Sequence, residues 1–305
     1  MKPHIVVVGS SNTDMIIRLN HIPRPGETIL GGEFLTAAGG KGANQAVGAA
    51  RAGGNVTFVA RVGRDILGEQ AIKRFVREGI RVETVSRDPK RPSGVALIFV
   101  AKDGENSIAV ASGANGALRP ADVIKARPAF RKAQVLLMQL ETPLETVSAA
   151  AALAQREGLY VILNPAPARD LPGRLLKQIS LLTPNESEAE ILSGIKVRDD
   201  KAASRAASKL RQRGVKTVIL TLGASGAFVS GPEGEALVPG FKVKAVDTTA
   251  AGDIFNGALA VGLGEGQPLL DAVRFANAAA ALSVTRFGAQ PSAPRRREIE
   301  ILLAS

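Results

Sequence analysis

Short runs of continuous apolar residues recur along this chain, and longer segments with helical spacing separate them. The runs are IVVVG, VTFVA, VLLMQ, YVILN, SLLTP and TVILT, at 5–9, 56–60, 135–139, 160–164, 180–184 and 217–221. Such strands must be covered on both faces, which is the environment of a parallel sheet between two helical layers. The alternation therefore predicts a doubly wound, mostly parallel α/β sheet with helices on both faces.

Helical spacing of apolar residues predicts the covering layers. Ala43, Ala46 and Val47 share one face of a helix, and Leu144 and Val147 begin another. The predicted helices span 41–52, 144–157, 188–192, 199–213, 253–264, 269–286 and 295–303.

Two segments interrupt this rhythm and carry no helix of their own. Residues 14–38 read as extended chain, with Pro23 and Pro25, and residues 94–110 read as a hairpin that turns at Asp103-Gly104. We expect 1–305 to be one domain in which these insertions form a small β-layer, either a lid over a site or an extra sheet edge.

Composition excludes several kinds of chemistry. There is no cysteine, so disulfides, thiol nucleophiles and cysteine-bound metals are ruled out. His4 and His21 are the only histidines, and their settings favour structural or solvated roles over a catalytic triad or a histidine metal site. No apolar run approaches the ~18 residues of a membrane span. We expect a cytoplasmic protein that does not associate with a membrane and whose acid–base chemistry uses carboxylates.

The net charge of +11 raises the question of nucleic acid. The basic residues are scattered, apart from RRR at 295–297, and only 4% of residues are aromatic, so platforms for stacking bases are scarce. This pattern favours a basic surface with no nucleic-acid partner, and it would also attract anionic substrates such as nucleotides.

Polar residues follow the predicted strands at their carboxyl ends, where open parallel sheets bind ligands. They are Asn12 and Asp14, Glu141, Asn164, then Asn185, Glu186 and Glu188, and finally the glycine-rich TLGASG. Each one alone has a simpler reading, since Asn185 or Ser187 is an ordinary helix start. Together they predict a site at one edge of the sheet.

The stretch AAGGKGANQA, at 37–46, is a glycine-rich loop that opens onto a helix. It matches neither the G-x-x-x-x-G-K-[ST] nor the G-x-G-x-x-G pattern. Gly39, Gly40 and Gly42 allow close backbone approach, and Lys41 and Asn44 offer donors that suit a hydroxyl-rich ligand. A simple tight turn is the alternative.

The stretch DTTAAGDIFNGAL, at 247–259, places small residues before a carboxylate and a helix. Asp253 could be an N-cap that accepts the free N–H groups of the first turn. The same N–H groups and the helix dipole could bind phosphate, with Asp253 acting on the group that meets it. We interpret the stretch as both at once.

These two stretches, with LLMQLE, NPAPAR, TPNESEAE, TLGASG and GAQPS at matching spacing, resemble the PfkB carbohydrate kinase family over essentially the whole chain. The resemblance implies a doubly wound α/β domain with a β-sheet lid. It also implies transfer of the γ-phosphoryl group of ATP to O5 of D-ribose, and a homodimer formed through the lid.

The resemblance also implies residue roles. Asp253 would be the catalytic base, and the N–H groups of Ala250, Ala251, Gly252 and Asp253 would form an anion hole. Besides Asp253, the sugar would be bound by Asn12, Thr13, Asp14, Gly40, Lys41, Gly42, Ala43, Asn44 and Glu141. The nucleotide and its Mg²⁺ would lie near Asn185, Glu188, Thr221, Leu222, Gly223, Ala224, Ser225, Gly226, Gly252 and Asn277. A K⁺ ion would be held by Asp247, Thr249, Ser283, Arg286, Gly288 and Ser292.

Three positions depart from the family pattern. Asn277 stands where related sequences often carry histidine near the adenine, and Thr249 and Ile254 replace commoner residues. Other activities stay open: a related kinase for deoxyribose or a nucleoside, or a basic nucleic-acid-binding or regulatory protein on the same fold.

Overall fold

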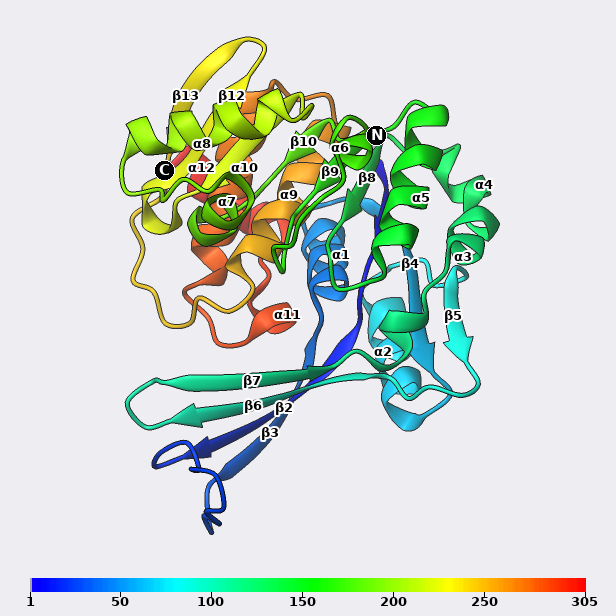
Figure 1. Ribbon diagram of the computed structural model, residues 1–305, viewed down its shortest axis with the longest axis vertical. Helices are drawn as coiled ribbons and strands as arrows, with labels where there is room; N and C mark the ends of the chain where they lie inside the picture. Colours follow the sequence, from blue (N-terminus) through cyan, green and yellow to red (C-terminus); the bar gives the residue numbers. More distant parts are fainter. Residues whose placement is uncertain (1) are drawn as a thin grey trace.

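A nine-stranded sheet forms the centre of the computed structural model, which describes residues 2–305 (Figure 1). Its strand order is β13-β12-β11-β10-β9-β8-β1-β4-β5. The parallel strands are β1 (His4–Val8), β4 (Asn55–Gly63), β5 (Val85–Asp88), β8 (Val135–Met138), β9 (Tyr160–Leu163), β10 (Leu181–Leu182) and β11 (Thr217–Thr221). The antiparallel hairpin β12 (Gly226–Gly231) and β13 (Gly234–Pro239) completes one edge.

Successive residues of each strand enter two different cores. Ile5 and Val7 pack with one helical layer, and Val6 and Val8 with the other. The first layer contains α1 (Lys41–Arg51), α2 (Ile66–Arg77), α9 (Ala251–Gly264), α10 (Leu269–Ser283) and α12 (Arg296–Ala304). The second contains α3 (Pro120–Lys125), α4 (Arg127–Phe130), α5 (Leu144–Arg156), α6 (Gly173–Leu176), α7 (Glu186–Ser193) and α8 (Asp200–Gln212). The doubly wound prediction is confirmed.

The two interrupting segments form a separate four-stranded sheet of order β3-β2-β6-β7, which projects from the body (Figure 1). Its strands are β2 (Asn12–Leu19), β3 (Glu33–Gly39), β6 (Gly94–Ala101) and β7 (Asn106–Ala111). We call it the lid sheet. Its register aligns Asp14, Ala96 and Val110 on one face, and Met15 and Leu97 with Ala109 on the other.

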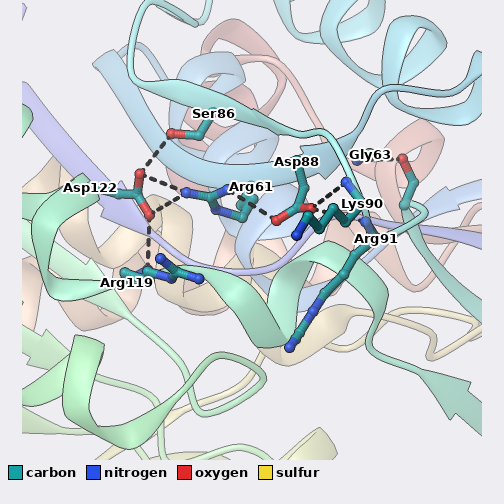
Figure 2. A network of polar contacts seen from close by, with 9 residues as sticks. Arg61, Gly63, Ser86, Asp88, Lys90, Arg91, Arg119 and Asp122 are labelled. Carbon is teal, nitrogen blue, oxygen red and sulfur yellow. Dashed lines mark hydrogen bonds and ion pairs between the residues drawn. The ribbon is translucent and has the colours of Figure 1, made fainter.

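Arg61 links β4, β5 and α3 within the body (Figure 2). Its guanidinium on β4 donates to Asp88 at the end of β5 and to both carboxylate oxygens of Asp122 on α3, each at 3.0 Å. Further donors to these two carboxylates come from Ser86, Lys90, Arg91 and Arg119. Burial raises the pKa of Asp122, but these hydrogen bonds and the Arg61 charge outweigh it and lower the pKa below its ordinary value.

Several elements differ from the sequence prediction. Helix α9 begins at Ala251 rather than 253, α10 ends at Ser283 rather than 286, and the run 180–184 contributes only two strand residues. The sequence prediction did not include α2, although its apolar residues have helical spacing, or the hairpin β12–β13. Three short elements complete the described chain: the 3-10 turns η1 (Gly113–Ala117) and η2 (Gly223–Ser225), and the helix α11 (Ala289–Ser292). Among residues 2–305, no helix has the length and apolar composition needed to cross a bilayer.

Candidate active site

A cavity of about 330 Å³ lies between the carboxyl ends of the parallel strands and the lid sheet. The body contributes Gly40, Lys41, Asn44, Glu141, Asn164, Ala166, Thr183, Asn185, Glu188, Thr221, Thr248, Thr249, Ala250, Ala251, Gly252, Asp253, Asn256 and Ala289. The lid sheet contributes Asn12, Asp14, Ala96, Ile98, Ile108 and Val110. A mixed polar and apolar cleft at this edge is where an open α/β sheet binds its ligand.

Asp253 is not the N-cap of α9, so that part of the sequence interpretation is wrong. Ala250 holds the N-cap position in a left-handed conformation (φ 60°), and Asp253 is the third residue of the helix. Its carboxylate accepts hydrogen bonds from Asn44 Nδ2 at 3.0 Å and from Gln45 Nε2 at 2.9 Å. Because neighbouring side chains supply these donors, the first-turn amides stay available for a ligand.

The start of α9 has the properties of an anion site. The amides of Gly252 and Asp253 find no acceptor within residues 2–305, while the Ala251 amide donates to Thr248 O at 3.2 Å. Unpaired first-turn amides and the helix dipole attract negative charge. A Cβ added at Gly252 would meet no atom within 4 Å apart from its chain neighbours and its own helix backbone, so the space beside Gly252 is open.

Close packing of α1 against α9 brings the glycine-rich loop to Asp253. A Cβ at Gly257 on α9 would lie 2.7 Å from both Gln45 O and Ala49 N, so glycine is required for the two helices to approach this closely. Gly40 precedes α1 with φ 88°, a conformation that glycine adopts without strain. The turn and the close approach are therefore both real, and Lys41 and Asn44 line the cavity.

Carboxylates crowd this cavity around one lysine. Burial, with smaller contributions from Glu141 and Asp253, raises the pKa of Asp14 to about 6. Burial also raises the pKa of Asp253, against the opposing effects of Lys41, Asn44 and Gln45. Burial alone would lower the pKa of Lys41, but the nearby carboxylates outweigh this effect, so the pKa of Lys41 is raised. A carboxylate with a raised pKa is better suited to accept a proton near neutral pH.

The remaining predicted sugar residues fall into two groups. Glu141 accepts from Ser10 Oγ and from the Lys41 amide at 2.9 Å, which joins the loop to the end of β8. Asn12 Oδ1 accepts from Asn115 Nδ2 at 2.7 Å, so the amide N–H₂ of Asn12 is free for a ligand. Gly42 is buried and does not line the cavity, and neither do Thr13 and Ala43.

Three of the predicted nucleotide residues outside α9, Asn185, Glu188 and Thr221, line the cavity. Asn185 and Glu188 form the capping box of α7, and both also line the cavity, so the simple reading and the functional reading coexist. Burial raises the pKa of Glu188. Thr221 lines the cavity, and Leu222, Gly223, Ala224, Ser225 and Gly226 form the turn between β11 and β12 beyond it. The Asn277 amide donates to Val238 O and Pro239 O at 3.0 and 3.2 Å.

The predicted cation residues come from two adjoining segments. Asp247 accepts from the Thr249 amide at 2.9 Å and the Gly288 amide at 2.8 Å, and its own amide donates to Val284 O. Burial raises the pKa of Asp247, but its hydrogen bonds outweigh this and lower it. The hydroxyls of Ser283 and Ser292 donate to Ala280 O and Ala289 O, which leaves their oxygens free to accept. Arg286 forms an ion pair with Glu298 through its side chain.

Sequence reasoning missed several cavity residues. Asn256 lies one helical turn after Gly252, and Thr183 directly follows β10, so helix and strand spacing contained a signal for both. Ile98 and Ile108 pair across the hairpin on the face that carries Asp14. Thr248 and Ala289 lie within the quoted stretches DTTAAGDIFNGAL and GAQPS, but neither was named as a site residue.

Known proteins share this architecture and sequence over almost their whole length. A ribokinase of Haemophilus influenzae is 46% identical over 298 residues, 98% of this chain and 97% of that protein. A deoxyribokinase of Salmonella typhimurium is 39% identical over 291 residues, 95% of each chain. A solved ribokinase of Arabidopsis thaliana, complexed with ribose and ATP, is 34% identical with a TM-score of 0.93 over 100% of both chains. Residues 2–296 match the description "pfkB family carbohydrate kinase". This chain belongs to the pfkB family of carbohydrate kinases.

Proposed function

We propose that this chain transfers the γ-phosphoryl group of ATP to O5 of D-ribose, giving D-ribose 5-phosphate. The observation that carries the proposal is the shared position of two groups: the unpaired amides of Gly252 and Asp253, and the Asp253 carboxylate, all at one end of one cavity. Phosphoryl transfer asks a protein mainly to position the reactants and to stabilise charge. The relatives named above and the Arabidopsis complex with ribose and ATP support the same activity.

The reaction follows from this geometry. The amides of residues 250–253 would stabilise the negative charge that grows on the γ-phosphoryl oxygens. Asp253 would align the O5 hydroxyl of the sugar and accept its proton as the new O–P bond forms, while the bond to the ADP leaving group breaks. Deprotonation can come late because the transition state is loose, so a carboxylate is a sufficient base.

Both the body and the lid sheet would bind the sugar. Lys41, Asn44 and Glu141 belong to the body, and Asn12 and Asp14 belong to the lid sheet. Their polar atoms suit a ligand with several hydroxyl groups, and Ile98 and Ile108 offer an apolar face to its carbon skeleton. We therefore assign segments 14–38 and 94–110 to a lid over the substrate within a single domain.

Two cations would assist. Asn185 and Glu188 are oxygen donors at the cavity wall, a donor type that Mg²⁺ prefers, and they would hold nucleotide-bound Mg²⁺ partly through water. Mg²⁺ would neutralise phosphate charge. The loop of Asp247 and Thr249 and the segment from Ser283 to Ser292 offer carbonyl, hydroxyl and carboxylate oxygens, which suit a K⁺ ion behind the anion hole. Since ATP and sugar meet in the cytoplasm, we place the protein there.

The outer face of the lid sheet would form a homodimer. Phe34 and Leu97 are 62% and 47% exposed on the face that points away from the cavity. Aligned with them are Met15, Ile17 and Phe99. An apolar sheet face of this kind is typically covered by a partner.

A coupled ATP-consumption assay tests the proposal with ribose, 2-deoxyribose, fructose and adenosine, each with K⁺ and with Na⁺. We expect the highest kcat/KM with ribose and faster turnover with K⁺. The deoxyribokinase relative makes 2-deoxyribose the second candidate, and a higher kcat/KM for that sugar would support it. Asp253→Asn should lose at least about 10²-fold in kcat with a smaller change in sugar KM. Near-normal turnover of this variant would remove Asp253 from its role.

A further inference from the structure

A row of residues lies directly beneath Asp253, one at the carboxyl end of each of four neighbouring strands. Gly9, Gln139, Asn164 and Thr183 immediately follow β1, β8, β9 and β10. Gln139, Asn164 and Thr183 are buried, and so is Gln45, which reaches this row from α1. None of these four polar residues was among the sugar or nucleotide ligands predicted from the sequence.

The hydrogen bonds in this row have a fixed direction. Asn164 Nδ2 donates to the backbone carbonyl of Thr183 at 2.9 Å, and a carbonyl can face only the N–H₂ side of an amide. Asn164 Oδ1 must therefore accept, and it does so from Gln45 Nε2 at 3.1 Å. The same Nε2 donates its other proton to Asp253 Oδ1 at 2.9 Å.

Gln139 fixes the other end of the Gln45 amide. Gln139 Nε2 donates to Gln45 Oε1. In this orientation the Gln45 amide therefore accepts one hydrogen bond through Oε1 and donates two through Nε2. Turning the amide over would place its oxygen against Asp253 Oδ1 and Asn164 Oδ1 in a buried site. That arrangement would lose both donated bonds and set acceptors against each other.

Gln139 is itself held in a space that the backbone keeps open. A Cβ at Gly9 would lie 2.2 Å from Gln139 Oε1, so a residue larger than glycine after β1 would displace this amide. Gln139 Oε1 has no hydrogen-bond partner among residues 2–305. The buried Gln139 side chain therefore makes one hydrogen bond, the one to Gln45 Oε1 that orients Gln45.

The same row also reaches the anion site. Thr183 Oγ1 donates to Asn256 Oδ1 at 2.6 Å, and Asn256 Nδ2 donates to Gly252 O at 2.7 Å. One connected network thus supports both the Asp253 carboxylate and the peptide group of Gly252.

We propose that Gln139 and Asn164 are positioning residues that lock Gln45 with its amide N–H on Asp253, and that Gln45 thereby fixes the carboxylate in its reactive orientation. This inference rests on the role proposed above for Asp253. On the opposite side, Asn44 Nδ2 holds Oδ2, and Gln290 Nε2 orients Asn44 by donating to its Oδ1 at 3.2 Å. Two oriented amides therefore grip the two carboxylate oxygens.

Replacing Gln45 should also change the proton affinity of Asp253. The charged groups that face Asp253 are Lys41 from α1, Glu141 after β8, Asp14 from β2 and Glu188 from α7. Burial and the carboxylates raise the pKa of Asp253, whereas Lys41 and the two amides lower it. Loss of the Gln45 donor leaves the burial effect with less opposition, so the pKa rises further.

The experiment compares Gln45→Met, Gln139→Met and the double variant, because methionine keeps the length of glutamine without its polar atoms. Gln45→Met should lower kcat by at least about tenfold, change the ribose KM by less than about threefold, and move the acid limb of kcat/KM upward by about one pH unit. Gln139→Met should lower kcat and raise the acid limb of kcat/KM in the same way, but by smaller amounts. The double variant should be no worse than Gln45→Met, because Gln139 acts through Gln45.

Thr146→Val is the matched control, since Thr146 is equally buried and donates to Leu118 O away from the cavity. It should leave the acid limb in place. An unmoved acid limb in Gln45→Met, or a double variant that shows the product of the two single effects, would overturn the inference. Should Gln45→Met fail to fold, Gln45→Glu tests the same point, because a second carboxyl group beside Asp253 raises the shared proton affinity.

A readout independent of turnover separates this inference from the proposed function. Titration of the Asp253 side-chain carboxyl by ¹³C NMR, assigned with Asp253→Asn, should show a higher pKa in Gln45→Met than in the unmodified protein. If the unmodified protein phosphorylates no sugar, the proposed function fails while this titration still tests the orientation of Gln45. An equal Asp253 pKa in both proteins would contradict the inference even if ribose is phosphorylated.

Discussion

Neither packing nor backbone conformation explains why residue 252 is glycine, whereas they explain the other glycines near the cavity. Gly257 is required by packing, and Gly40 by its backbone conformation, but Gly252 has helical geometry and open space around it. The protein alone would therefore accept a methyl group there. A ligand that occupies that space would not.

Gly252→Ala should therefore separate folding from function. Alanine is favoured over glycine in a helix, so the free energy of unfolding should stay equal or rise by about 0.5–1 kcal/mol. Turnover should fall by about 10²-fold because the methyl group obstructs the anion site. Urea unfolding and steady-state kinetics measure the two effects. Gly257→Ala is the matched comparison, and it should lose stability because its Cβ would meet the α1 backbone.

Asp14 should destabilise the fold once its buried carboxyl group is ionised, above about pH 6. Its pKa rises from 3.8 to about 6 on folding, so stability falls as pH rises through that range and the buried group ionises. Asp14→Asn removes this cost, and at pH 8 it should raise the free energy of unfolding by up to about 3 kcal/mol. At pH 4 the two proteins should be nearly equal. Thermal melts at both pH values test this, and an equally stable variant at pH 8 would contradict it.

At the residue scale, sequence reasoning predicted the residues whose signal is local. Small residues before Asp253 and polar residues after strands are visible in a window of a few positions. Gln139 and Thr183 also follow strands, but their importance arises from the adjacency of β8, β9 and β10 in space. The family resemblance assigned Thr13 to the sugar, yet alternation along β2 separates its side chain from that of Asp14.

At the element scale, the pairing of α1 with α9 explains why two distant glycine-rich stretches form one site. Continuous apolar runs predicted the parallel strands, because burial on both faces leaves a strong pattern. The start of α9 was misplaced by two residues because a left-handed alanine, Ala250, precedes it instead of a side-chain cap. Helix α2 was missed even though Leu67, Ala71 and Phe75 recur at helical spacing and Asp65 precedes them as an N-cap, so the sequence does carry a helical signal there.

The Arg61 network should be the main electrostatic link between β4, β5 and α3 (Figure 2). Arg61→Ala leaves Asp88 and Asp122 without their shared cation, and breaking a buried pair in this way costs about 3–5 kcal/mol. Arg127→Ala, which removes a half-exposed partner of Glu157, should cost about 1 kcal/mol or less. Denaturant midpoints compare the two. The Arg61→Ala difference should shrink as pH falls and the lowered pKa of Asp122 is crossed, and a difference that does not depend on pH would argue against the network.

At the scale of the whole molecule, the lid sheet presents one face to the cavity and an apolar face to its surroundings. Leu97→Glu places a charge at the centre of the outer face, beside Met15. We expect the unmodified protein to have a mass near twice 31.7 kDa in light scattering, and the variant to have a mass near 31.7 kDa. Asn106→Glu, on the exposed β7 edge of the opposite face, should leave the dimer intact. An unmodified protein that is monomeric at micromolar concentration would contradict the proposal.

The residues proposed to bind the sugar are divided between the body and the lid sheet, which are joined by short connections such as residues 9–11 between β1 and β2. A pentose held by Asn12 and Asp14 on one side and by Lys41 and Asn44 on the other would connect the lid sheet to the body. On this proposal, a bound sugar would restrain the lid sheet relative to the body. Product release would remove that restraint, and binding of the next sugar would restore it.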